Sequence, residues 1–171
     1  MTPDFKRFSA ISMFSDFTLR QLTPIFDKIQ AFSYAAGEII LQPGSTRIGL
    51  YFVIDGLARI YTNVEDQEIT LAAIHPGDFF GEISVVENRP PSAFARAEEE
   101  TLIYFLSQKD FQDLTAEGST LAAKIWEALV RVVITRLTKS NGMVLQYFHM
   151  NKALCENPKF REFYQLCQFG N

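Results

Sequence analysis

The sequence has few of the residues that build metal centres and disulfide frameworks. Its 171 residues include two cysteines and two histidines. Cys155 and Cys167 do not form a CxxC motif, and His75 and His149 are 74 residues apart. Neither spacing is that of a zinc or iron–sulfur site, nor of the clustered histidines of a cupin-type metalloenzyme. We therefore expect free thiols, no metal and no catalysis.

Membrane spans and leader segments are also missing. No run of about 20 apolar residues appears, which excludes a transmembrane helix. The N-terminus has no apolar stretch behind the basic pair Lys6-Arg7, which argues against secretion. Apolar residues make up 47% of the chain, too many for a disordered protein. The length suffices for one core with an appendage, and we expect a cytoplasmic protein.

Charge divides the chain near residue 118. Residues 1–118 carry nine Lys and Arg against seventeen Asp and Glu, whereas residues 119–171 carry seven against three. An acidic first part followed by a basic second part indicates two structural segments. We expect an N-terminal helix and a β-domain in residues 1–118, and a long helix with a short helical tail in residues 119–171.

The first segment contains glycines at turn-like spacings, with short runs of strand-forming residues between them. These runs are Leu50 to Ile54, Leu57 to Tyr61, Ile69 to Ile74 and Leu102 to Leu106. Short strands with a turn every 8 to 12 residues or so are typical of an antiparallel sandwich or barrel. The pattern predicts a mainly β fold with flanking helices (α+β), in which a jelly-roll-like antiparallel β-roll runs from about Phe32 to Leu106. Apolar residues at helical spacing predict a preceding helix over Asp16–Gln30.

Two helices are expected after the roll. Ser107 and Asp110 have the form of a capping box, which starts a short helix through about Leu114. A longer helix begins at Ser119 or Thr120. We expect the pair Asn141-Gly142 to interrupt this longer helix. A further helical stretch then runs from Met143 to about Leu154.

The longer helix carries two adjacent apolar rows. The first row is Trp126, Val130, Val133 and Leu137, and the second is Leu121, Ile125, Leu129 and Val132. An apolar arc this wide can cover the roll with one row and a partner subunit with the other. The pattern therefore predicts a homodimer formed through the first row. The alternative is a monomer with a single broad buried face.

Three glycine-containing motifs occur in a fixed order within the predicted roll. They are Ala36-Gly37-Glu38-Ile39-Ile40, Leu50-Tyr51-Phe52-Val53-Ile54-Asp55-Gly56 and Pro76-Gly77-Asp78-Phe79-Phe80-Gly81-Glu82. In this order and spacing they closely resemble the cyclic-nucleotide-binding domain family. That family includes catabolite-activator-type regulators, kinase regulatory subunits and gated channels. The resemblance covers roughly residues 15–140 and is specific, because five glycines coincide with the strand pattern.

The resemblance implies a site for a cyclic phosphate monoanion such as cAMP or cGMP. A buried anion needs hydrogen-bond donors and a compensating charge. In the family, a short helix after a Phe-Gly-Glu motif points its first backbone N–H groups at the phosphate. Gly81, Glu82, Ile83 and Ser84 occupy these positions here. By the same resemblance, Glu82 is the carboxylate that accepts a hydrogen bond from the ribose 2′-hydroxyl.

The arginine that pairs with the phosphate in the family is replaced in this chain. Counted without a gap from the Gly-Glu pair, Pro91 falls on its position, and proline has neither a side-chain donor nor a backbone N–H. A lost charged hydrogen bond of about 1.5 to 3 kcal/mol would lower affinity about ten- to hundredfold or more. Arg89 and Ser92 are substitute donors from the same loop, with a solvated loop arginine as the alternative reading of Arg89. Arg96 is a weaker candidate, because the strand alternation places it opposite the inward-facing alanines.

Three further positions give weaker evidence about a ligand. Counted from Phe111, the helix positions where catabolite-activator-type members place paired hydroxyls against the base fall on Arg136-Leu137, which makes Arg136 the base-side candidate. His75 lies near where a haem-binding relative carries an axial ligand, but we interpret it as a loop histidine. The triplet Glu98-Glu99-Glu100 is interpreted as a solvated hairpin tip.

Two hypotheses about function remain. After Asn141-Gly142 there are 29 residues, about half of what a winged helix-turn-helix needs, so no DNA binding by that motif is expected. The first hypothesis is a non-enzymatic sensor that binds cAMP, cGMP or another small anion and acts through an effector protein. The second is a degenerate, ligand-free dimeric scaffold for protein–protein interaction. The intact Phe80-Gly81-Glu82 favours the first, whereas Pro91 and Arg136-Leu137 favour the second.

Overall fold

The computed structural model describes residues 2–65, 67–116 and 120–156. The chain divides into two compact units, with the boundary after Leu129. The first unit holds all the strands and the shorter helices, and the second begins at Val130 within the last helix. Cys167, and with it most of the expected C-terminal tail, lies outside the described residues.

Three short helical segments precede the first strand. They are α1 (Phe5–Ser9), the 3-10 turn η1 (Ser12–Phe14) and α2 (Leu19–Phe26). The first of these was not expected from the sequence, and Asp4 caps it by accepting a hydrogen bond from the Arg7 N–H at 3.0 Å. The helix predicted over Asp16–Gln30 is shorter than expected. It starts after the N-cap Thr18, whose N–H and hydroxyl both contact the Gln21 side chain, and it ends before Asp27.

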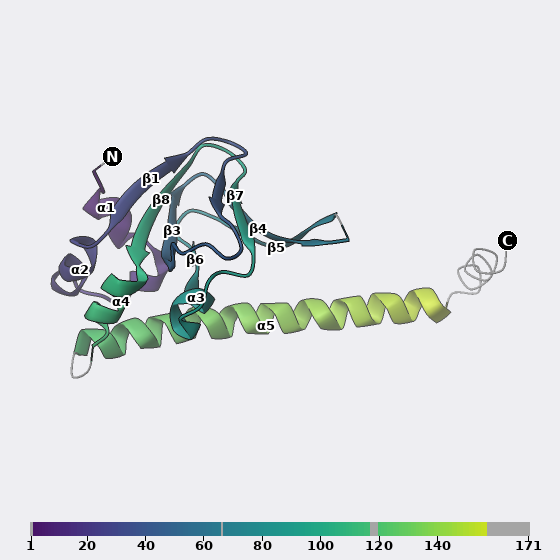
Figure 1. The fold of residues 1–171 in the computed structure, drawn as a ribbon. Coiled ribbons are helices and arrows are strands. Elements are labelled where there is room, and N and C mark those ends of the chain that lie inside the picture. Colours follow the sequence, from purple (N-terminus) through teal and green to yellow (C-terminus); the bar gives the residue numbers. More distant parts are fainter. Residues whose placement is uncertain (1, 66, 117–119, 157–171) are drawn as a thin grey trace. The chain divides into compact units, whose positions relative to one another are not determined.

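The β-roll consists of two antiparallel four-stranded sheets (Figure 1). The strands are β1 (Gln30–Tyr34), β2 (Ile39–Leu41), β3 (Gly49–Asp55), β4 (Ala58–Val64), β5 (Gln67–Ile74), β6 (Phe79–Phe80), β7 (Phe94–Ala97) and β8 (Thr101–Ser107). Their order is β1-β8-β3-β6 in one sheet and β2-β7-β4-β5 in the other. This arrangement confirms the antiparallel β-roll predicted from the sequence, including its approximate limits.

Apolar side chains fill the space between the two sheets. Ala58, Ala95 and Ala97 are fully buried on the β2-β7-β4-β5 sheet, and their small size leaves room for larger residues from the facing sheet. An aromatic row crosses that facing sheet, with one ring from each strand in the order β1, β8, β3 and β6. Its members are Phe32, Phe105, Tyr51 and Phe80, and neighbouring ring centroids lie 4.8 to 6.3 Å apart.

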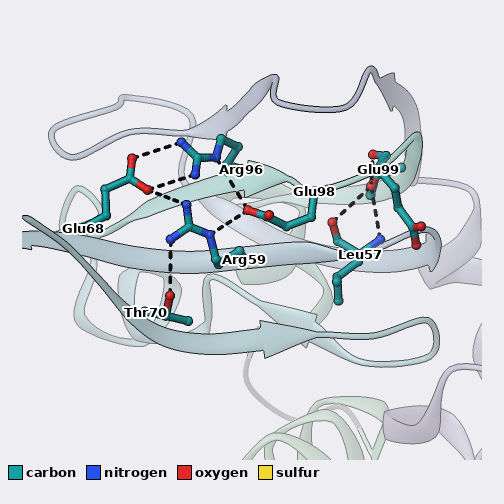
Figure 2. A network of polar contacts seen from close by, with 8 residues as sticks. Leu57, Arg59, Glu68, Thr70, Arg96, Glu98 and Glu99 are labelled. Atoms are coloured by element: carbon teal, nitrogen blue, oxygen red, sulfur yellow. Dashed lines mark hydrogen bonds and ion pairs between the residues drawn. The ribbon is translucent and has the colours of Figure 1, made fainter.

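The outer face of the β2-β7-β4-β5 sheet carries a charged network (Figure 2). Arg59 contacts Glu98 at 2.6 Å and also pairs with Glu68, which accepts two hydrogen bonds from Arg96 at 2.9 and 3.0 Å. Both guanidinium groups also lie over the ring of Tyr61, at 4.6 and 5.0 Å from its centroid. Arg96 therefore points away from the roll interior, as the strand alternation predicted.

Two helices follow the roll, α4 (Gln108–Leu114) and α5 (Thr120–Glu156). Ser107 caps α4 by accepting a hydrogen bond from the Asp110 N–H, which confirms the helix start predicted at Ser107. The expected interruption at Asn141-Gly142 is wrong, because α5 runs through both residues. Gly142 has no positive φ, and a glycine inside a helix costs only about 1 kcal/mol, less than breaking the helix.

The two apolar rows of α5 differ in burial. Ile125 and Leu129, from the second row, are each 2% exposed. Val130, Val133 and Leu137, from the first row, are 50%, 40% and 59% exposed. Leu121 and Val132, also from the second row, are partly buried. The second row is thus the more buried of the two, most of all at Ile125 and Leu129. Among the described residues, no helix combines the length and apolar character needed to cross a lipid bilayer.

Candidate ligand-binding site

The turn between β6 and the short helix α3 (Glu82–Glu87) admits only glycine. Gly81 has a φ of +93° and is the N-cap of α3. A Cβ at this position would lie 2.3 Å from the carbonyl oxygen of Gly49 and 3.1 Å from the ring of Tyr51. Such distances require the neighbours to move, and one of them is backbone. Close packing against β3 therefore fixes where α3 begins.

The four residues predicted at the start of the binding helix lie together at the N-terminal end of α3. Glu82 is partly buried, Ser84 is buried and Ile83 is 59% exposed. The first N–H groups of a helix have no partner within the helix. The structure thus places Gly81 as the N-cap of α3 and Glu82, Ile83 and Ser84 in its first turn. Their role in binding a ligand stays a prediction.

The loop after α3 presents both substitute donors from the sequence at the surface. Asn88 ends the helix in the left-handed region, with a φ of +51°, and the Arg89 N–H then donates to the Ser84 carbonyl at 3.2 Å. The Arg89 side chain is 60% exposed and pairs with Glu87. Ser92 is also exposed. In this conformation the loop turns neither side chain inward.

Pro91 is the buried residue of this loop. Its carbonyl oxygen accepts a hydrogen bond from the Gly44 N–H at 3.0 Å. This bond connects the loop after α3 to the loop between β2 and β3. The position expected for a phosphate-pairing arginine is therefore occupied by an apolar ring inside the protein. The compensating cation, if the site takes an anion, has to come from another segment.

The loop between β2 and β3 carries Arg47, which belongs to none of the sequence motifs. The Arg47 guanidinium lies over the rings of Phe32 and Phe105, at 3.9 and 5.2 Å from their centroids. The Arg47 carbonyl accepts a hydrogen bond from the Tyr51 hydroxyl at 2.5 Å. The hydrogen bond between Gly44 and Pro91 brings the loop of Arg47 to the loop after α3, although the two loops are far apart along the chain.

The tyrosines beside Arg47 are held in their neutral form. Burial raises the pKa of Tyr51 well above its ordinary value, and the charge of Arg47 opposes only part of that rise. Burial also raises the pKa of Tyr34, again against the influence of Arg47. Both phenols therefore remain uncharged over the physiological range, and a hydrogen bond between the Tyr34 and Arg47 side chains opposes part of the rise in the pKa of Tyr34.

The base-side candidate belongs to the other compact unit. Arg136 and Leu137 lie in α5 after the unit boundary at Leu129, and the Arg136 side chain is partly buried. Their role towards a bound base stays a prediction. Within the part of the chain that the structure describes, no three His, Cys, Asp or Glu residues gather in a way that could hold a metal ion.

The family model for the cyclic nucleotide-binding domain matches residues 31–117, just over half of the chain. The chain belongs to the cyclic nucleotide-binding domain family. This match covers the roll from the second residue of β1 onward, together with α3, α4 and the loop after α3.

Individual relatives agree with this membership. A cyclic AMP receptor protein of Thermus thermophilus is 33% identical over 57% of this chain and 46% of its own length. A putative potassium channel protein of Rhodopseudomonas palustris is 29% identical over 67% of this chain and 28% of its own. The crystal structure of Thermus thermophilus catabolite activator protein matches with a TM-score of 0.69 at 26% identity, covering 83% of this chain and 65% of that one. The chain thus spans less than half the length of these two curated relatives.

Proposed function

We propose that this protein is a non-enzymatic ligand-sensing module that binds cAMP, cGMP or another small anionic ligand inside its β-roll. Membership of the cyclic nucleotide-binding domain family carries this proposal. The Gly81 turn supports it, because it holds Glu82 and the first N–H groups of α3 together at one point. In this proposal Glu82 accepts a hydrogen bond from a ribose hydroxyl, and the N–H groups of Ile83 and Ser84 face the phosphate.

Calorimetric titration of the full chain with cAMP and with cGMP tests this proposal. Glu82→Ala should weaken binding about tenfold or more, because the ribose hydroxyl loses a charged acceptor. Glu99→Ala is the matched control, since Glu99 is an exposed acidic residue next to the start of β8, and its removal should leave the affinity unchanged. Equal affinities for all three proteins would remove Glu82 from the site.

We further propose that the module acts as a homodimer through the exposed row of α5. The row consists of Trp126, Val130, Val133 and Leu137, which recur at steps of four and three. Three of these side chains are 40% exposed or more, and Trp126 is 38% exposed although its ring also meets that of Phe111 edge-on at 5.2 Å. Apolar residues at this spacing pack best against a second helix.

Sedimentation of the wild-type chain and of Val133→Glu tests the dimer. A charge in the centre of a helix–helix seam should convert the dimer to a monomer, because a buried carboxylate has no partner there. A matched charge outside the row, Thr138→Glu, should leave the dimer intact, since Thr138 is an exposed residue of the same helix. A monomeric wild-type chain would contradict this part of the proposal.

A second candidate function is a dimeric scaffold that binds no ligand. The observation in its favour is Pro91, which is buried where the family pattern places a phosphate-pairing arginine. A domain that has lost its ligand can retain the roll, because contacts such as that of Gly81 with Gly49 maintain the fold without one. Absence of binding to cAMP and cGMP would favour this candidate.

A further inference from the structure

We propose that Arg47, on the loop between β2 and β3, supplies the positive charge that pairs with the phosphate of the bound cyclic nucleotide. This inference rests on the proposed function, since it assigns the cation of the same site. It gives Arg47 the role that an arginine at the position of Pro91 has in the family.

The loop of Arg47 is connected to the segment Phe80–Ser92, which we call the cassette. The connection is direct at the Ser92 end and runs through Tyr51 at the Phe80 end. At the far end, the Gly44 N–H donates to the Pro91 carbonyl at 3.0 Å. At the near end, the Tyr51 hydroxyl donates to the Arg47 carbonyl at 2.5 Å, and the Tyr51 ring stacks on Phe80 with centroids 5.0 Å apart. The same ring would lie 3.1 Å from a Cβ at Gly81. The loop of Arg47 is thus bonded directly to Pro91, and Arg47 itself is bonded to Tyr51, the residue that packs against Phe80.

The guanidinium of Arg47 is not committed to a carboxylate. Among the described residues, no Asp or Glu lies within ion-pair distance of it. Arg59 and Arg96, by contrast, share Glu68 and Glu98 on the outer face of the roll, and Arg89 pairs with Glu87. If any of these three arginines were to bind the phosphate, its ion pair with a glutamate would have to break. Arg47 can bind an anion without breaking an ion pair with a carboxylate.

The Arg47 side chain is exposed, and its guanidinium lies over two rings of the aromatic row, those of Phe32 and Phe105. Phe105 is 4% exposed and Phe32 is partly buried against the core of the roll. A guanidinium held by its face against aromatic rings can still donate from its N–H edge to an acceptor. That edge can pair with two phosphate oxygens at once, which is the strongest form of such a contact. The ligand class that fits is a cyclic phosphate ester with one negative charge.

Calorimetric titration of the full chain with cAMP and with cGMP tests the assignment. We expect Arg47→Gln to weaken the better-bound nucleotide about ten- to hundredfold, as for a lost charged hydrogen bond. Arg47→Lys should retain much of the affinity, because the charge remains although the paired N–H groups are lost. Arg20→Gln is the matched control, because Arg20 is an exposed arginine of α2, and it should change the affinity by less than about threefold.

Salt dependence separates a charge contact from a structural role. The affinity of the wild-type chain should fall as the ionic strength rises, and that of Arg47→Gln should fall less steeply. Equal losses in Arg47→Lys and Arg47→Gln, or equal salt slopes, would overturn the assignment. So would normal nucleotide binding by Arg47→Gln, and this outcome would leave the proposed function intact. Failure of the wild-type chain to bind either nucleotide would overturn both this assignment and the proposal that the module binds a cyclic nucleotide.

Discussion

The two ends of the cassette, Phe80–Glu82 and Asn88–Ser92, differ in what holds them in place. At the first end, the turn at Gly81 is fixed by contact with the backbone of Gly49, so that no other residue fits. At the second end, exposed side chains surround the buried Pro91, whose carbonyl is bonded to Gly44. The first end retains the family motif, and the second departs from it.

This difference shows that a sequence motif can be kept for packing reasons, and that its presence alone does not establish a ligand-binding site. The turn at Gly81 is required by packing of β6 against β3, whether or not a ligand binds. Pro91 is buried, but its hydrogen bond to Gly44 uses the backbone carbonyl, which any residue at this position would supply. The fold can therefore be kept while the side chain at position 91 changes. In our proposal Arg47 supplies the positive charge, from the loop that is bonded to Pro91 through Gly44.

The largest effect should come from changing the constrained end. We expect Gly81→Ala to lower the free energy of unfolding by about 3 kcal/mol, because it adds a steric clash with backbone to an unfavourable φ. Gly44→Ala is the control. Gly44 also has a positive φ, of +77°, but a Cβ there would meet nothing within 4 Å, so its loss should be about 1 kcal/mol. Chemical denaturation measures both, and equal losses would contradict the packing argument.

A smaller change should follow from restoring the family arginine at the second end. Pro91→Arg should tighten the binding of cAMP or cGMP about tenfold, since one more charged hydrogen bond reaches the phosphate. Pro90→Arg adds the same charge at the preceding, exposed position and should change the affinity by less than about threefold. Calorimetry of both variants is the measurement. Equal gains would show that the added charge acts only through long-range attraction.

The smallest effect should come from the exposed part of the second end. Removing Arg89 breaks its surface ion pair with Glu87, and such pairs contribute about 0 to 1 kcal/mol. We expect Arg89→Ala to leave both the unfolding free energy and the nucleotide affinity close to those of the wild-type chain. A tenfold loss of affinity would instead return the role of phosphate partner to Arg89, as the sequence alone proposed.

Local patterns accounted for most of the fold. The strands were predictable because turn glycines separate their β-forming runs, and the cap of α4 because Ser107 and Asp110 are three residues apart. The difference between the two rows of α5 followed from helical periodicity. The turn-like pair Asn141-Gly142 misled the prediction, because a long helix tolerates one glycine.

The candidate site was predictable only in part. Gly81 and Glu82 lie in a contiguous motif, so the sequence could place them together. Arg47 escaped notice because its proximity to the cassette depends on a hydrogen bond between Gly44 and Pro91, which are far apart along the chain. Contacts of this kind are set by strand register in the folded roll, and no local spacing in the sequence encodes them.

Thermal unfolding of the wild-type chain at rising concentrations of cAMP or cGMP tests the central claim most directly. A ligand that binds only the folded state stabilises it by about 2.7 kcal/mol at a hundredfold excess over the dissociation constant. For a chain of this size that corresponds to a rise in Tm of about 5 to 10 °C. The account predicts such a rise for at least one of the two nucleotides. An unchanged Tm with both nucleotides at millimolar concentration would contradict it and favour the ligand-free scaffold.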